Sequence, residues 1–197
     1  IETFDFDRCS GILTNRKRVY CSERFDYNGV QTSDHTQGLA FSPNSRFLYL
    51  YFFKKAYQVD TWASNPQQTL ALLGNYDGFT IDAPPDIYTH SYFGLAQLAP
   101  DGRIYTNTTQ QTPYFHTTKW PNNQGLSAGF TQHSFELAGY NLGHIPNYPN
   151  YRLGPLEGST CDTLGVEKAV YILAHPYPAD GCVGGSAHFE ATAFGTG

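Results

Sequence analysis

Two stretches of this chain carry nearly the same pattern of apolar and polar positions. The sequence GLAFSPNSRFLYLYF begins at Gly38, and GLAQLAPDGRIYTNT begins at Gly94, 56 residues later. Each apolar run is followed by a turn tripeptide, Pro43-Asn44-Ser45 or Pro100-Asp101-Gly102. Proline presets φ in such a turn, and the following residues tolerate the left-handed region. The repetition predicts a structure built from copies of one unit.

The pattern after each turn predicts a series of strands. The run FLYLYFF is apolar at successive positions, which is typical of a strand buried on both faces. IYTNTT is the corresponding strand of the second copy and has fewer apolar residues. The second strands are AYQVDTW and YFHTTKW, and they end on the chain's two tryptophans, Trp62 and Trp120. We therefore place both tryptophans at the same point of the unit. QTLALLGNYD and GLSAGFTQHSFEL supply a further strand in each copy.

The beginning of the chain matches the middle of this unit. FDFDRCSG at 4–11 fits YQVDTWAS at 57–64, and RKRVYCSERF fits the strand after it. Four-stranded units repeated in this way are typical of β-propeller blades, since one blade cannot bury its faces alone. We expect an all-β fold, a partial β-propeller of about two and a half to four blades. Its open strand edges would pair with another copy of the chain or with an upstream part of its precursor.

Composition and charge narrow the classes of partner. The chain has 15 Tyr, 14 Phe, 19 Gly and 12 Pro, which suits short strands joined by tight turns. A net charge of −5 with only 12 Lys and Arg argues against nucleic acid as a partner. No apolar run approaches the roughly 18 residues that a membrane span needs, so we expect no membrane insertion. Because the chain begins at Ile1, we expect a processed protein or a fragment.

Four motifs carry a resemblance to a known family. FDRCSGIL, GLAFSPNSRFLYL, QLAPDGRIY and IPNYPNYRLGPLEGSTCDTLG, spread over residues 3–165, resemble successive motifs of secreted β-propeller-like proteins from Bacteroidetes. AHPYPADGCVGGSAHFEA, from Ala174, resembles the start of the sorting domain read by the type IX secretion system, with Tyr177 where asparagine is usual. The resemblance implies a propeller portion at 1–165, a sorting-type tail at 166–197, and an extracellular or cell-surface location. It implies no particular reaction.

The four cysteines are Cys9, Cys21, Cys161 and Cys182. An even number in an exported protein allows two disulfides in three possible pairings. Our hypothesis is the sequence-local pairing, Cys9 with Cys21 and Cys161 with Cys182. The alternative is that the cysteines are reduced and buried. Closely spaced ligand pairs such as C-x2-C are missing, so we assign no metal site.

Three segments carry residue types used in catalysis or metal binding, and each has a structural interpretation that we favour. Asp34 and His35 could form an acid/base couple, but neighbours on a strand face opposite ways. A second segment offers three carboxylates for calcium without the usual ligand spacing, and we expect a solvated connection there. A third offers histidines that we expect to pack or hydrogen-bond. The second set is Asp77, Asp82, Asp86 and His90, and the third is His133, Glu136 and His144.

Two short patterns suggest glycosylation, Asn107-Thr108-Thr109 and Asp162-Thr163-Leu164, of which the latter resembles a Bacteroidetes O-glycosylation acceptor. The sequence contains no nucleophile elbow, phosphate loop or H-E-x-x-H motif, so we assign no catalytic residue and no cofactor. The leading hypothesis is a non-enzymatic extracellular binding or assembly protein of the cell surface, with a filament subunit as one form of it. The alternative is a fragment of a secreted propeller hydrolase or lyase acting on polysaccharide.

Overall fold

The computed structural model describes residues 1–7, 9–21, 23–27, 30–83, 87–141, 143–145, 171–174 and 192–194. These residues form strands and two short 3-10 helices and contain no α-helix, which confirms the all-β prediction. None of the helices in the described part could cross a membrane. The chain divides into two compact units, residues 1–4 with 15–147 and residues 5–14 with 148–197. The predicted boundary at 165 stays a prediction.

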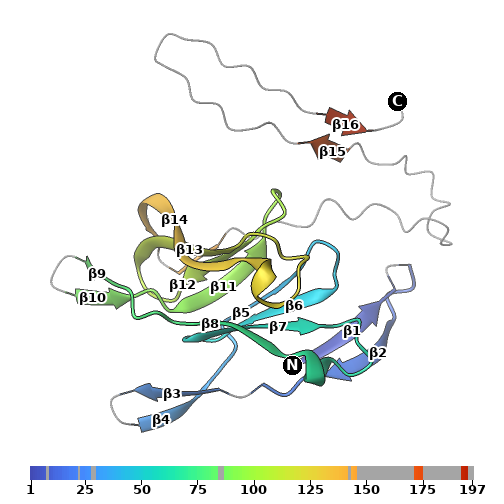
Figure 1. Ribbon diagram of the computed structural model, residues 1–197, viewed down its shortest axis with the longest axis horizontal. Helices are drawn as coiled ribbons and strands as arrows, with labels where there is room; N and C mark the ends of the chain where they lie inside the picture. The colour runs from blue at the N-terminus through green and yellow to red at the C-terminus, as the bar shows by residue number, and fades with distance from the viewer. Residues whose placement is uncertain are drawn as a thin grey trace. The chain divides into compact units, whose positions relative to one another are not determined.

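Two four-stranded antiparallel sheets dominate the first unit (Figure 1). In each sheet the strands follow their order along the chain, and a 3-10 helix precedes the last strand. This shared order confirms the repeated unit. The first sheet contains β5 (Gly38–Phe41), β6 (Phe47–Tyr51), β7 (Lys55–Asp60), η1 (Pro66–Thr69) and β8 (Ala71–Asn75). The second contains β11 (Phe93–Leu98), β12 (Ile104–Thr108), β13 (Thr112–Thr118), η2 (Gly125–Ala128) and β14 (Phe130–Asn141).

Four two-stranded sheets complete the described structure. One of them, β9–β10, lies in the segment where we expected a solvated connection, and it follows β8 as β3–β4 follows β2. The pairs are β1 (Glu2–Phe6) with β2 (Leu13–Arg18), β3 (Glu23–Tyr27) with β4 (Val30–Asp34), β9 (Thr80–Ala83) with β10 (Ile87–His90), and β15 (Tyr171–Ala174) with β16 (Thr192–Phe194).

The hairpin β1–β2 corresponds to β7–β8 of the repeated unit. Each first strand is followed by the same local turn, in which an aspartate accepts a hydrogen bond from the backbone two residues later. The N–H of Cys9 donates to Asp7 Oδ1 at 2.8 Å, and the N–H of Trp62 donates to Asp60 Oδ1 at 3.0 Å. The predicted match of FDFDRCSG with YQVDTWAS therefore agrees with the hydrogen bonding.

The strand β6 is buried on both faces, as its apolar run predicts. Tyr49 and Tyr51 belong to a core shared with Phe93 and Ile104 of the second sheet. Leu48 and Leu50 belong to a second core, on the opposite face, with Val59, Phe52 and Val19. Val19 follows β2, so the first sheet lies between the β1–β2 hairpin and the second sheet.

The turns that open the two sheets match, but their lengths differ by one residue. Asn44 and Asp101 each accept a hydrogen bond from the N–H two residues on, and the intervening Ser45 and Gly102 have φ of 59° and 81°. In the first sheet Phe41 pairs with Leu48, which leaves residues 42–47 between them. In the second, Leu98 pairs with Ile104, which leaves 99–103. Beyond the turn, Leu48 therefore corresponds to Ile104.

This one-residue difference corrects the placement of the tryptophans. Leu48 pairs with Val59 in the first sheet, and Ile104 pairs with Thr118 in the second, so Val59 corresponds to Thr118. Trp62 lies three residues beyond Val59, but Trp120 lies only two beyond Thr118. The two tryptophans are therefore one position apart in the unit. A shift of one residue exchanges the two faces of a strand, so the predicted match between them is wrong.

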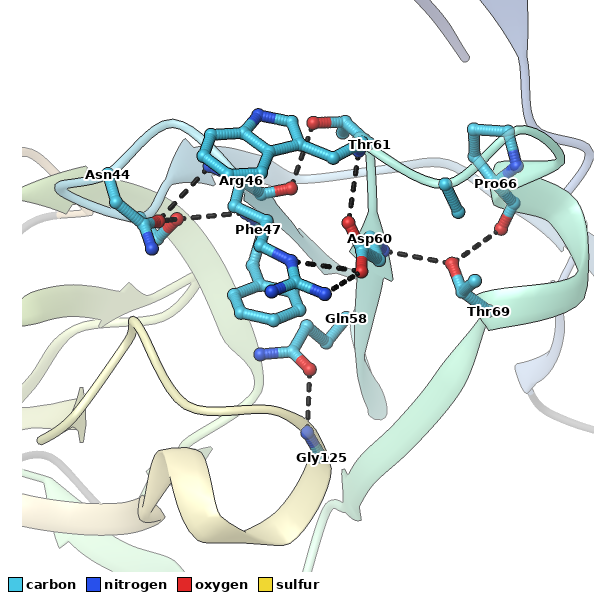
Figure 2. A network of polar contacts seen from close by, with 12 residues as sticks. Asn44, Arg46, Phe47, Gln58, Asp60, Thr61, Pro66, Thr69 and Gly125 are labelled. Carbon is cyan, nitrogen blue, oxygen red and sulfur yellow. Dashed lines mark hydrogen bonds and ion pairs between the residues drawn. The ribbon is translucent and has the colours of Figure 1, made fainter.

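Buried polar side chains join the two sheets. Gln58 Nε2 donates to the hydroxyl of Tyr49 at 2.7 Å and to the carbonyl of Asn123 at 2.8 Å. Gln58 Oε1 accepts from the N–H of Gly125 at 2.7 Å (Figure 2). The Tyr49 hydroxyl also donates to the carbonyl of Pro121 at 2.8 Å. The connection before η2 is thus held by β6 and β7 of the first sheet.

A salt bridge stabilises the end of β7, two residues beyond Gln58. Arg46 Nη2 lies 2.7 Å from Asp60 Oδ2, and the N–H of Asp60 donates to Thr69 Oγ1 at 2.9 Å (Figure 2). The hydrogen bond from Arg46 lowers the pKa of Asp60. This arrangement connects the turn before β6 with the end of β7 and with η1.

At Gly38 the strand β5 lies close against the backbone of β11. A Cβ atom at Gly38 would lie 2.3 Å from the carbonyl oxygen of Gly94 and 2.7 Å from the nitrogen of Ala96. Both atoms belong to backbone, which cannot rotate away as a flexible side chain does. By contrast, a Cβ atom at Gly139 in β14 would meet no atom within 4 Å.

We predict that Gly38→Ala lowers the free energy of unfolding by more than about 2 kcal/mol, because β5 and β11 must separate to admit the methyl group. The matched control Gly139→Ala changes it by less than about 0.5 kcal/mol. Chemical denaturation followed by tryptophan fluorescence measures both values. Equal effects of the two substitutions would contradict the close packing of these strands.

Candidate functional site

The structure joins two candidate segments that the sequence left separate. His133 Nε2, in β14, lies 2.8 Å from Asp77 Oδ2, just after β8. The ring of Phe79 stacks on the His133 ring, with centroids 4.2 Å apart and planes 21° apart. The Tyr114 ring stands edge-on to Phe79, at a centroid distance of 5.3 Å. We call the two polar residues the Asp77–His133 pair.

Backbone hydrogen bonds hold the Asp77–His133 pair in place. The N–H of Phe79 donates to Asp77 Oδ1 at 3.0 Å, and the N–H of Asp77 donates to Gln132 Oε1 at 3.2 Å. Gln132 Nε2 in turn donates to the carbonyl of Asn75 at 2.8 Å. Because Gln132 and His133 are neighbours in β14, the pair fastens the segment after the first sheet to the last strand of the second.

His133 occupies an unusual backbone conformation, with φ of 35°, where the register between β13 and β14 shifts. Its N–H donates to Nδ1 of His116 at 3.0 Å. His116 is fully buried and meets Phe93 edge-on at a centroid distance of 4.8 Å. Since its Nδ1 accepts a hydrogen bond, the neutral ring carries its proton on Nε2, which has no hydrogen-bond partner.

The environment favours an ionised Asp77 and a neutral His116. Partial burial works against ionisation of Asp77, but the hydrogen bonds from Phe79 and His133 hold its pKa below the ordinary value. Burial, and to a smaller extent the neighbouring His133, lowers the pKa of His116 to about 4. At neutral pH the site therefore holds an ionised carboxylate beside a neutral, buried imidazole.

A carboxylate that orients an imidazole is an arrangement used in general base catalysis. The side chains of Asp77 and His133 are 39% and 32% exposed, so solvent reaches both. In the described part of the chain, no group of three or more His, Cys, Asp or Glu side chains is placed to hold a metal ion. The geometry therefore supports proton transfer or a structural link, and the contacts of Gln132 and Phe79 favour the link.

A second aromatic group surrounds His90, which the sequence placed at the end of the acidic segment. The His90 ring stacks on Tyr92 at 4.7 Å, and Tyr92 meets Tyr76 at 4.8 Å. The Tyr76 hydroxyl donates to the carbonyl of Phe79 and lies 3.3 Å from His90 Nδ1. His90 thus packs at the base of the β9–β10 hairpin, in the segment where we expected a solvated connection.

The structure does not bring the remaining candidates into a common site. His35 is exposed, and His144 is exposed with its N–H donating to Asn141 Oδ1 at 2.9 Å. Glu136 accepts a hydrogen bond from the Tyr114 hydroxyl at 3.4 Å. The side chains of Asp34 and Asp82, and all of Asp86 and of Asp162-Thr163-Leu164, lie outside what is described.

The predicted glycosylation and disulfide positions are only partly within the described residues. Asn107 is 1% exposed, so its amide is buried against the backbone of Gly94 rather than presented to solvent. Of the cysteines, Cys9 and Cys21 are described, and no disulfide bond between these two is present. Cys161 and Cys182 lie outside the described residues. The predicted pairing of Cys9 with Cys21 is therefore wrong, and the pairing of Cys161 with Cys182 stays a prediction.

We predict that stability falls as the pH decreases from about 6.5 to about 4, the ordinary and folded-state pKa values of His116. In this window the unfolded chain binds a proton that the folded protein does not, which removes up to about 3 kcal/mol. Asp60 and Asp77, whose pKa values are lowered from 3.8, contribute only at lower pH.

Unfolding measured by denaturant at a series of pH values tests this expectation. His116→Asn keeps an acceptor for the N–H of His133 but cannot titrate, so its stability should vary less over the window. The control His35→Asn, at an exposed histidine, should keep the wild-type slope. An unchanged slope in the His116→Asn variant would contradict the role of His116.

Comparison of the chain with protein-family models, with curated proteins and with solved structures gives no match.

Proposed function

We propose that this chain is a non-enzymatic binding or assembly protein of the cell surface, built as a partial β-propeller whose sheets stack on further sheets. The observation that carries the proposal is the outer face of the second sheet. On the first sheet the corresponding face is covered. On the second it presents aromatic side chains that are partly open to solvent.

The correspondence between the two faces follows from the strand register. Tyr49 pairs with Gln58 and is fully buried beneath the second sheet. Tyr105 takes the corresponding place in β12, and its ring meets Phe135 edge-on at 5.6 Å. Phe115 pairs with Phe135, which is 44% exposed. A face that is buried in one copy of the unit and aromatic but half open in the next suits stacking of another sheet.

The sequence supports the location and the propeller arrangement. The four motifs over residues 3–165 resemble secreted Bacteroidetes proteins, and the segment from Ala174 resembles a type IX sorting signal. Stacking of successive sheets through non-identical faces is the geometry of a propeller when the rotation closes and of a filament when it does not. An extracellular filament subunit is therefore one form of the proposed function.

A specific observation also favours the second candidate, a secreted hydrolase or lyase acting on polysaccharide. The Asp77–His133 pair is partly exposed and could transfer a proton. If it is catalytic, Asp77→Asn abolishes the release of reducing ends from the polysaccharide that the wild type degrades. Wild-type protein that degrades no acidic or neutral polysaccharide would leave this pair with its structural role.

We predict that wild-type protein self-associates and that Phe135→Asp shifts it toward the 22.0 kDa monomer. A charge at the centre of the aromatic face opposes its burial by another sheet. The matched control is Leu126→Asp in η2, where a leucine that is 77% exposed lies away from that face. Sedimentation velocity over a range of concentrations measures the effect. A wild type that stays monomeric throughout, or a control that dissociates equally, would contradict stacking on this face.

A further inference from the structure

The face of the first sheet that lies against the β1–β2 hairpin is covered over only part of its width. Leu48, Leu50 and Val59, in β6 and β7, are buried there beside Val19. Leu39 and Phe41 in β5 are 48% and 43% exposed.

The exposed residues belong to the same face as the buried ones. Leu39 pairs with Leu50, and Phe41 pairs with Leu48, so each shares a face with a residue of that core. An apolar strip one strand wide therefore remains open beside the hairpin.

The hairpin itself is bound to the first sheet as one sheet is bound to the next. Lys17 Nζ donates to the carbonyl of Thr61 at 2.7 Å. The N–H of Tyr20 donates to Gln67 Oε1 at 2.6 Å, and Gln67 Nε2 donates back to the carbonyl of Tyr20 at 3.1 Å. These contacts reach the connection between β7 and β8, just as Gln58 reaches the corresponding connection of the second sheet. The hairpin thus takes the place of a preceding sheet.

A complete sheet of this kind has two more strands than the hairpin. In the first sheet, β7 pairs with β6 on one edge and with β8 on the other. β1 corresponds to β7 and β2 to β8. Among the described residues, β2 is the one strand that pairs with β1. The opposite edge of β1, at Glu2–Phe4, is the position at which a strand equivalent to β6 would bind.

One further pair of strands would cover both the open edge of β1 and the exposed apolar strip of Leu39 and Phe41. In the observed interface, β5 packs closely against β11, with Gly38 against the backbone of Gly94. β5 of the first sheet corresponds to β11 of the second. A strand that packs on β5 as β5 packs on β11 would therefore lie against Leu39 and Phe41. Its neighbour then lies beside β1.

We propose that the β1 edge and the strip of Leu39 and Phe41 form an acceptor site for a β-hairpin from another polypeptide. One strand of the partner hydrogen-bonds to β1 at Glu2–Phe4, and the other covers Leu39 and Phe41. The partner is a two-stranded segment with apolar residues on alternate positions, like β5 and β6, because strand addition supplies the backbone bonds and the alternate side chains supply specificity. This inference rests on the proposed binding or assembly role and names its partner class.

A peptide with the sequence of residues 37–53, which contains both strands and their turn, is the probe. We expect it to bind the full chain and to protect the amides of Glu2 and Phe4 from hydrogen exchange, because Ile1 bonds to Val19 of the hairpin and the N–H groups of Glu2 and Phe4 therefore point to the open edge. A peptide with Leu50→Pro loses a backbone donor and should bind at least about tenfold more weakly. Anisotropy of a labelled peptide gives the affinities.

The acceptor is tested by Leu39→Lys together with Phe41→Lys, which should weaken binding at least about tenfold. The matched control is Leu95→Lys, because Leu95 follows Gly94 as Leu39 follows Gly38 and is 45% exposed. The control should bind the peptide within about twofold of wild type. Absence of peptide binding, an equal loss in the control, or unprotected amides at Glu2 and Phe4 each overturns the acceptor site. The Phe135→Asp experiment measures stacking on the second sheet separately, so the two proposals fail independently.

Discussion

The structure depends on how closely β5 lies against β11. At Gly38 there is no space for a single additional carbon between the two strands. This approach brings Tyr49 and Tyr51 of the first sheet into one core with residues of the second, and it sets Gln58 within reach of the connection before η2. Gln58 is buried, so its amide must be hydrogen-bonded within the protein, and it is bonded on both the oxygen and the nitrogen. The close contact and the satisfied amide fix the position of one sheet on the other.

Much of the fold follows from the sequence because the repeat is visible there. The two turn tripeptides, the doubly apolar run before Phe53 and the strands after it all lie where the pattern indicates. The pattern could not give the register. The connection at 99–103 is one residue shorter than that at 42–47, and this difference moves every later side chain to the other face relative to a simple alignment. Deletion of one residue from a turn has almost no signal in the composition of the strands around it, so Trp62 and Trp120 were wrongly matched.

The Asp77–His133 pair shows why the site was harder to foresee than the fold. Its members lie 56 residues apart, after β8 and within β14, and neither segment has a motif that names the other. They meet because the sheets pack together and because the β13–β14 register shifts beside His133, whose φ of 35° turns its N–H toward His116. Positive φ costs free energy at a residue other than glycine or asparagine, so the surrounding contacts must stabilise it. Sequence reasoning identified the histidine, but not the long-range contact that determines what it does.

The two sheets have the same topology, but they differ in how well the buried polar groups of their cores are hydrogen-bonded. Where the first sheet has Tyr51, the second has Asn107. Tyr51 is buried with its hydroxyl 3.0 Å from Thr118 Oγ1, whereas neither polar atom of the Asn107 amide has a hydrogen-bond partner. An unsatisfied buried amide costs about 1–3 kcal/mol. The second sheet therefore carries at Asn107 a cost that the first sheet avoids at Tyr51. If a further sheet stacks on the aromatic face around Phe135, as we propose, it removes apolar surface of the second sheet from water and so stabilises that sheet.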